Sequence, residues 1–280
     1  MGDATRIKNI MIKSEYSIIR LLIFLGFVYL LVVGVAFFLS EKMMFPYKES
    51  SYGQDVANLK FIKTEDGNTV ATRFWKSELN SHLILYFHGN GEDVGELDSF
   101  AEQMNSLGVS VLTFDYRGYG LSSGKASESN VNSDALLVLD MARELGYEND
   151  KILLWGRSIG SGGAVHLATS SEFAGLILVS PLKSIYTVIT GFSIIPFDRF
   201  DSYSKLDQFD FPLYIVHGTE DQVIASSHGV QMFESYRGKK CISLIDGAGH
   251  NNLWSHGFSD YFPLIIDFVS KEDVECETSY

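Results

Sequence analysis

ILLWGRSIGSGGA, residues 152–164, reads as a buried strand, a sharp turn and a helix of small residues in immediate succession. The turn, Gly156 to Gly160, matches the pattern G-x-S-x-G, which places a serine between a strand and a helix. Side chains two positions from the serine would clash in so tight a turn, and glycine avoids that clash on both sides. We therefore expect Ser158 to stand exposed at the carboxyl edge of a parallel sheet, where open α/β sheets bind ligands. A purely structural turn is the alternative.

Strand-like and helix-like blocks alternate on both sides of this stretch. Continuous apolar runs, typical of strands buried on both faces, occupy Leu83–Phe87, Val109–Phe114, Ile152–Trp155, Leu176–Val179, Leu213–Val216 and Ile242–Ile245. Two alternating runs, Leu59–Lys63 and Val70–Trp75, precede them and predict an antiparallel edge. Helical blocks lie near residues 96–106, 131–145, 159–170, 226–235 and 260–270. The alternation predicts an α/β fold with a mostly parallel, doubly wound sheet, into which residues 181–211 insert a short lid.

An uncharged run of 19 residues, LLIFLGFVYLLVVGVAFFL, extends from Leu21 to Leu39. As a helix it would measure about 30 Å, the hydrocarbon thickness of a bilayer, so we expect one uncleaved transmembrane anchor at residues 18–40. A cleaved signal peptide is the alternative, although the run is long for one and a good cleavage site is missing. Four basic residues precede the run, whereas only Lys42 and Lys48 follow it closely. The positive-inside rule then predicts a cytoplasmic tail at residues 1–17 and a body on the non-cytoplasmic side.

Charge and cysteine content narrow the class of protein further. The net charge of the chain is −13, and the basic N-terminal segment makes the remaining body more acidic still. Such a body repels phosphate, so we expect no nucleic-acid partner. Two cysteines are too few for a disulfide framework or a zinc site. We expect Cys241 to pack as a small hydrophobic residue and Cys276 to be free.

A serine hydroxyl is a weak nucleophile that needs a positioned base and a group to orient that base. His250 follows the last apolar run in a glycine-flanked loop, where a base could reach Ser158, whereas the other histidines after the serine suit helix, turn or polar positions. Asp221 follows the run Leu213–Val216 and would fix the tautomer of His250, with Glu220 as the local rival. The chain order of serine, acid and histidine agrees with the order in which hydrolases that carry G-x-S-x-G place their triad.

Two backbone N–H groups are expected to bind the oxyanion that forms during acyl transfer. One belongs to Ile159, directly after the serine, and the other to Asn90, in the loop His88-Gly89-Asn90-Gly91. In the lid, apolar residues recur at helical spacing, and we expect Ile185, Ile189 and Phe192 to contact the substrate. A lid helix that only completes the core is the alternative.

Six motifs in order, FHGNGED, DYRGYGLSSGKASE, LWGRSIGSG, SPLKSI, HGTEDQVI and GAGHN, resemble the depalmitoylase branch of the α/β-hydrolase-domain proteins and its membrane-anchored relatives. The resemblance covers roughly residues 42–270. It implies an α/β-hydrolase domain at residues 41–271, with a polar tail at 272–280, and ester or thioester hydrolysis without a metal or organic cofactor. It places the nucleophile, acid and base on Ser158, Asp221 and His250. The depalmitoylase branch attaches to membranes through an N-terminal cysteine cluster, which this chain replaces with an apolar helix, so the helix-anchored relatives fit better.

We therefore expect a membrane-anchored serine hydrolase that acts on an acyl ester or thioester through an acyl-enzyme, with membrane lipid around its N-terminal helix. A peptidase of the serine aminopeptidase type could use the same triad and is an alternative. A non-catalytic, membrane-tethered binding protein on a hydrolase fold is the alternative from another class.

Overall fold

The computed structural model describes residues 2–46, 49–79, 81–191, 195–271 and 276 of the chain. The chain divides into two compact units, Met1–Met43 and Met44–Tyr280, and each is described by itself.

The first unit is formed by helix α1, which runs from Gly2 to Met44 and so continues into the second unit by one residue. The expected span at residues 18–40 lies within it, but the helix extends further in both directions. Residues 2–17 contain no proline to stop a helix, and the backbone pairs with itself along its whole length. Among the described residues, only Tyr16–Phe38 is long and apolar enough to cross a membrane, with a mean hydropathy of 2.8 over an exposed stretch. A signal sequence would meet the same criterion.

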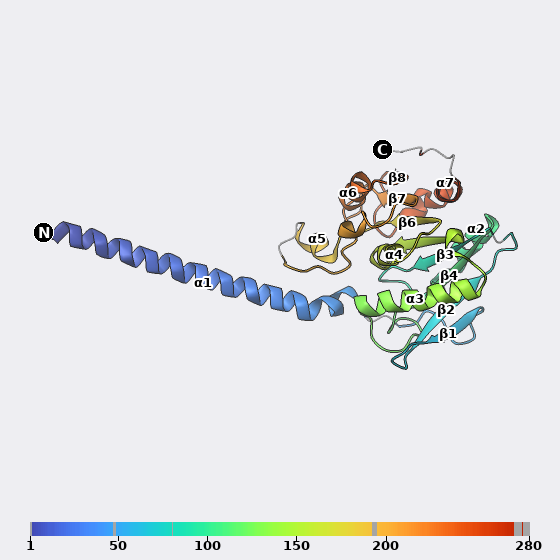
Figure 1. Ribbon diagram of the computed structural model, residues 1–280, viewed down its shortest axis with the longest axis horizontal. Coiled ribbons are helices and arrows are strands. Elements are labelled where there is room, and N and C mark those ends of the chain that lie inside the picture. The colour runs from blue at the N-terminus through green and yellow to red at the C-terminus, as the bar shows by residue number, and fades with distance from the viewer. Residues whose placement is uncertain (1, 47–48, 80, 192–194, 272–275, 277–280) are drawn as a thin grey trace. The chain divides into compact units, whose positions relative to one another are not determined.

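The second unit is built on one sheet (Figure 1), which has eight strands within the described residues. The strands are β1 (Leu59–Lys63), β2 (Thr69–Trp75), β3 (His82–Phe87), β4 (Val109–Phe114), β5 (Ile152–Arg157), β6 (Gly175–Val179), β7 (Leu213–Gly218) and β8 (Lys240–Ile245). Their order is β1-β2-β4-β3-β5-β6-β7-β8. Strand β2 pairs antiparallel with β1 and with β4, and all the other neighbours are parallel. The expected antiparallel edge and parallel centre are confirmed.

Helices cover both faces of the sheet. Successive strand residues point to opposite faces, so each face of the sheet has its own apolar cluster. Leu83 and Leu85 of β3 belong to one apolar cluster, whereas Ile84 and Tyr86 belong to the other. The first cluster contains the buried faces of α3 (Glu128–Glu144), α4 (Gly160–Ala168) and α6 (Ser227–Ser235). The second contains those of α2 (Asp98–Ser106) and α7 (Phe262–Ser270). The result is a doubly wound sheet whose parallel strands end at one common edge.

Short 3₁₀ segments and one short helix complete the unit. The 3₁₀ segments lie at Val94–Glu96, Asn149–Lys151, Tyr203–Lys205, Leu253–His256 and Phe258–Tyr261. Helix α5 (Ile185–Thr190) lies between β6 and β7, inside the segment that the sequence marked as a lid.

The two cysteines form a disulfide, so the expectation of a free Cys276 is wrong. The Cα atoms of Cys241, in β8, and Cys276 lie 5.3 Å apart. The Nζ of Lys239, just before β8, donates hydrogen bonds to the carbonyl oxygens of Phe268 and Lys271 at 2.9 and 2.6 Å. The chain that follows α7 therefore passes beside the start of β8. The spacing of the two cysteines in the sequence does not reveal that these segments are neighbours. Cys241 is buried, as expected.

Candidate active site

Ser158 lies directly after β5 in a left-handed backbone conformation with φ of 52°. The residue is only 9% exposed, because His250 packs against its Oγ, so the expectation of an exposed serine is wrong. Its N–H still donates to the carbonyl oxygen of Val179 at 2.9 Å, so the strand pairing continues up to the turn itself. A Cβ at Gly156 would lie 2.6 Å from the Cα of Ser161, and one at Gly160 would collide with the carbonyl oxygen of Phe87. Both glycines are therefore required by close backbone approach, and strand, turn and α4 form the nucleophile elbow that the sequence predicted.

The side chains of Ser158, His250 and Asp221 form a continuous relay at the carboxyl edge of the sheet. His250 Nε2 lies 2.9 Å from Ser158 Oγ, and His250 Nδ1 lies 2.7 Å from Asp221 Oδ2. An ionised Asp221 can only accept, so the ring carries its proton on Nδ1 and presents a bare Nε2 to the serine hydroxyl. The structure thus brings together three residues from the loops after β5, β7 and β8 in the geometry that proton transfer requires.

Asp221 is held by more groups than His250 alone. Its Oδ1 accepts from the backbone N–H groups of Val223 and Ile224 at 2.9 and 2.8 Å. His217 Nε2 lies 2.8 Å from the carbonyl oxygen of Ile224 and 3.4 Å from Asp221 Oδ2, so it donates across the same turn. Burial alone would raise the pKa of Asp221, but the hydrogen bonds from His217, His250 and Ile224 outweigh it and hold the pKa well below its usual value. The carboxylate is therefore ionised throughout the neutral range.

The loop His88–Gly91 follows β3, a parallel neighbour of β5, and is called the oxyanion loop below for the role that the sequence predicts for Asn90. Asn90 is half-buried, and its Oδ1 accepts a hydrogen bond from Tyr119 Oη at 2.5 Å. Ile159 is buried immediately before α4, so its N–H belongs to the helix-terminal groups that lack an intrahelical partner. The collision expected for a Cβ at Gly160 with the carbonyl oxygens of Phe87 and His88 shows how closely α4 approaches this loop. Asn90 and Ile159 therefore lie on neighbouring segments, and their role as oxyanion donors stays a prediction.

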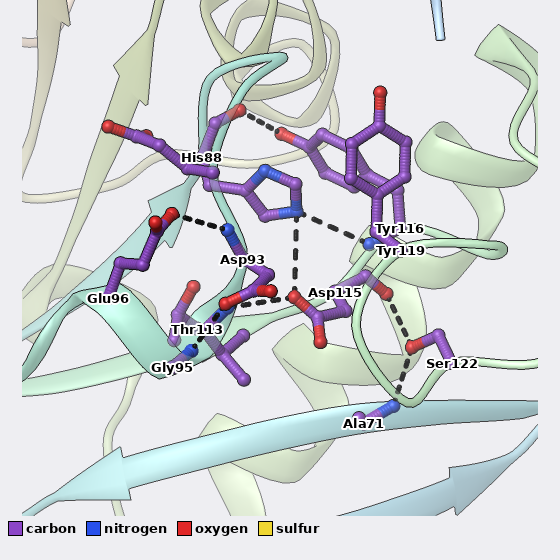
Figure 2. A network of polar contacts seen from close by, with 12 residues as sticks. Ala71, His88, Asp93, Gly95, Glu96, Thr113, Asp115, Tyr116, Tyr119 and Ser122 are labelled. Carbon is purple, nitrogen blue, oxygen red and sulfur yellow. Dashed lines mark hydrogen bonds and ion pairs between the residues drawn. The ribbon is translucent and has the colours of Figure 1, made fainter. Parts of the chain in front are cut away.

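A buried polar network joins the start of the oxyanion loop to the residues that follow β4 (Figure 2). The ring of His88 faces Asp115 and the backbone of Tyr116. The backbone carbonyl oxygen of His88 accepts a hydrogen bond from Tyr116 Oη at 2.8 Å. Asp115 accepts from the N–H of Val94 at 2.8 Å and from Tyr52 Oη. Burial, which these hydrogen bonds only partly offset, raises the pKa of Asp115 from 3.8 to about 7.

The apolar side chains of the lid helix α5 lie in two different environments. Ile185 packs against the core, whereas Ile189 is 63% exposed. Asp198 anchors the start of the helix, because its carboxylate accepts from Ser184 Oγ at 2.6 Å and from the N–H of Tyr186 at 3.0 Å. Phe192, the third residue expected to contact substrate, lies outside the described residues.

Sequence analysis overlooked two charged residues beside the site, Arg157 and Glu92. Their side chains form an ion pair that is mostly buried, with exposures of 12% and 19%. Arg157 is the last residue of β5, and Glu92 lies in the loop that follows β3, a parallel neighbour of β5. Opposite charges at and just beyond the ends of two buried strands were the available signal, but strand order was needed to recognise it.

The fold and the site define a hydrolase of the α/β class, with its serine, acid and histidine on the loops where that class carries them. Human alpha/beta hydrolase domain-containing protein 17B is 34% identical over 239 residues, which cover 84% of this chain and 82% of the relative. The Caenorhabditis elegans alpha/beta hydrolase domain-containing protein aho-3 is 34% identical over 226 residues, with coverages of 78% and 68%. The chain belongs to the α/β-hydrolase superfamily.

Further comparisons agree on the fold. A family model described as serine aminopeptidase, S33, matches residues 80–196. Est1E from Butyrivibrio proteoclasticus superimposes with a TM-score of 0.61 at 17% identity, covering 77% of this chain and 100% of its own. The mouse alpha/beta hydrolase domain-containing protein 10 gives a TM-score of 0.59 at 17% identity, with coverages of 75% and 99%.

Proposed function

We propose that this chain is a membrane-anchored serine hydrolase that cleaves an acyl ester or thioester through an acyl-enzyme. The observation that carries the proposal is the relay from Ser158 through His250 to Asp221, at 2.9 and 2.7 Å, on a serine held in a left-handed turn. A serine placed only to make a turn needs neither a bare imidazole nitrogen at hydrogen-bond distance nor a carboxylate behind that ring.

In the first half of the reaction, Ser158 Oγ attacks the carbonyl carbon of the substrate while its proton passes to His250 Nε2. The carbonyl oxygen becomes an oxyanion, which the N–H groups of Asn90 and Ile159 would stabilise. The bond to the leaving alkoxide or thiolate then breaks, and that group takes the proton from His250. In the second half, water gives a proton to His250 and attacks the acyl-serine, and the acid is released as the proton returns to Ser158. Asp221 stabilises the imidazolium in both halves without itself becoming protonated.

Covalent labelling of the full chain in detergent by a fluorophosphonate probe tests the proposal, with hydrolysis of p-nitrophenyl and thioester substrates followed in parallel. We expect the wild type to be labelled and Ser158→Ala to lose both labelling and about 10⁶-fold of kcat. Ser161→Ala is the matched control, because Ser161 lies at the start of α4 and its Oγ binds the carbonyl oxygen of Ser158 and the N–H of Leu182 rather than His250. An unlabelled, inactive wild type would leave the binding-protein alternative.

Peptide hydrolysis is a second candidate, because the family model that matches residues 80–196 is described as serine aminopeptidase. An amine is a poorer leaving group than an alkoxide or thiolate and depends more on protonation by His250. Aminoacyl p-nitroanilides should therefore be cleaved at least about 10²-fold more slowly than the matched p-nitrophenyl esters. A faster anilide would favour the peptidase.

The N-terminal helix supports a membrane location for this activity. Tyr16–Phe38 has the length and hydropathy of a single span, and basic residues precede it. We propose that the N-terminus is cytoplasmic and the catalytic body non-cytoplasmic. The disulfide between Cys241 and Cys276 supports the same orientation, because such bonds persist in oxidising compartments and are rare in the cytosol.

A further inference from the structure

The ion pair of Arg157 and Glu92 connects three loops that the proposed reaction uses. Arg157 is the residue between Gly156 and Ser158, so it belongs to the nucleophile elbow. Its Nη1 pairs with Glu92 Oε1, and its Nη2 donates to the carbonyl oxygen of His250 at 3.4 Å. The guanidinium also lies 5.6 Å from the ring centroid of Trp254, which follows the loop of His250.

Glu92 in turn forms hydrogen bonds with the oxyanion loop. Its Oε2 accepts from the N–H of Gly89 at 2.8 Å, and its own N–H donates to the carbonyl oxygen of Gly89 at 3.3 Å. A Cβ at Gly89 would lie 3.3 Å from Glu92 Oε2 and 3.6 Å from Arg157 Nη1. Both charged groups are therefore packed directly against the residue that precedes Asn90.

Mostly buried charges hold their geometry better than surface pairs. The two side chains are 12% and 19% exposed, so water screens them little, and each has a second partner in a different catalytic loop. An arginine suits this position because its planar guanidinium can bind Glu92 and the carbonyl oxygen of His250 at the same time, whereas the ammonium of a lysine is a single point charge.

We propose that Arg157 and Glu92 are a positioning pair for hydrolysis, which locks the oxyanion loop and the loop of His250 to the nucleophile elbow. This inference rests on the proposed function and adds to it two residues that bind the backbone of the catalytic loops rather than the reacting atoms. The oxyanion and the imidazolium exist only during the reaction, so the loss of alignment should lower kcat while KM changes little. A misplacement of about 1 Å can reduce rate by about 10²-fold.

The test compares the full chain in detergent as wild type, Arg157→Gln, Glu92→Gln, the double variant and Arg157→Lys. Active sites are titrated with the fluorophosphonate, so that kcat refers to folded enzyme only. We expect each single Gln variant to lose about 10- to 100-fold in kcat, with KM within about threefold of wild type. The double variant should be no worse than the poorer single variant, because the two residues act as one unit. Arg157→Lys should recover part of the loss.

The exposed pair of Arg143 and Asp140 provides the matched control, since it lies on α3 with exposures of 41% and 65%. Arg143→Gln and Asp140→Asn should leave kcat unchanged. Single variants of Arg157 and Glu92 with wild-type kcat per titrated site, or losses that simply multiply in the double variant, would overturn the positioning role. The double variant leaves no unpaired buried charge, so it keeps the test valid if a single variant folds poorly. A wild type that neither labels nor hydrolyses would instead overturn the proposed function, and this inference with it.

Discussion

Ser158 has a backbone conformation that a serine rarely adopts, with φ of 52°. A non-glycine residue in this region costs about 1 kcal/mol or more, and such strain persists only where the surroundings enforce it. Here the strand bond to Val179 and the tight approach of Gly156 and Gly160 enforce it. The same turn directs the hydroxyl toward His250 Nε2, so the strain and the candidate nucleophile coincide in one residue.

Asp221 gives the sharpest prediction at the scale of single residues. In Asp221→Asn the new amide would donate to His250 Nδ1 and force the proton onto Nε2, where it would oppose the serine hydroxyl. We expect kcat to fall by about 10⁴-fold with little change in KM. Glu220→Gln is the matched control, because Glu220 is the adjacent carboxylate and is exposed. If the Glu220 variant were inactive and the Asp221 variant near wild type, the acid would be assigned to the wrong residue.

At the scale of elements, sequence pattern predicted each strand of the sheet to within two residues at either end. Continuous apolar runs mark buried strands well, because both faces of a parallel strand must be apolar. The order of the strands could not be predicted in the same way, because the residue pattern of β3 does not indicate that β4 and β5 are its neighbours. The Arg157–Glu92 pair and the Cys241–Cys276 disulfide depend on such neighbour relations, and for that reason the sequence did not reveal them.

The candidate triad was accessible from sequence for a related reason. Chain order and the position of each loop after a strand suffice to select Ser158, Asp221 and His250. The residues that hold the triad in place could not be predicted from the sequence. His217 has the sequence context of an ordinary turn residue, yet its Nε2 lies 3.4 Å from Asp221 Oδ2. The catalytic roles of all three stay predictions until variants are measured.

The lid helix α5 leads to a prediction about substrate length. Ile189 is 63% exposed, and an acyl chain that covered it would gain up to about 0.8 kcal/mol per methylene, or about fourfold in kcat/KM. We expect kcat/KM for p-nitrophenyl esters to rise from acetate to a medium acyl chain. Ile189→Gln should flatten the rise, whereas Leu136→Gln, which changes an exposed leucine of α3, should not. A steady decrease from acetate upward would contradict an acyl-binding lid.

The network below the oxyanion loop predicts a pH dependence of stability. The pKa of Asp115 is raised from 3.8 to about 7, so the folded protein keeps a proton that the unfolded chain loses between these values. The stability that this carboxyl contributes is therefore full below about pH 4 and is lost as the pH rises through about 7. Relative to Asp115→Asn, the wild type should lose up to about 1.4 kcal/mol of unfolding free energy per pH unit in that window.

Denaturant unfolding of the full chain in detergent at a series of pH values measures this difference. Asp55→Asn is the control, because Asp55 is exposed, and its curve should run parallel to that of the wild type. Parallel curves for wild type and Asp115→Asn between pH 4 and 7 would show that Asp115 titrates normally. A difference of the opposite sign would show that the buried carboxylate is stabilised rather than opposed by its surroundings.

At the scale of the whole molecule, the two ends of the chain make related demands on location. The apolar stretch Tyr16–Phe38 has the length and hydropathy of a single membrane span. The disulfide between Cys241 and Cys276 is of a kind that persists in oxidising compartments and is rare in the cytosol. Basic residues before the apolar stretch favour a cytoplasmic N-terminus, which would place the body and its disulfide outside the cytosol. The basic flank and the disulfide are independent of each other, and the orientation that we propose is consistent with both.

That orientation predicts the redox state and accessibility of the protein in intact cells. After lysis with a polymer-linked maleimide in denaturant, which exposes the buried Cys241, we expect no adduct without reductant and two adducts per chain with it, since the sequence has two cysteines. Cys276→Ser should add one polymer without reductant, which calibrates the assay. Protease added to the non-cytoplasmic side of sealed membranes should digest the body, and alkaline carbonate should leave the full chain in the pellet. Two free thiols together with full protection would reverse the orientation, and release by carbonate would show that the helix is not an anchor.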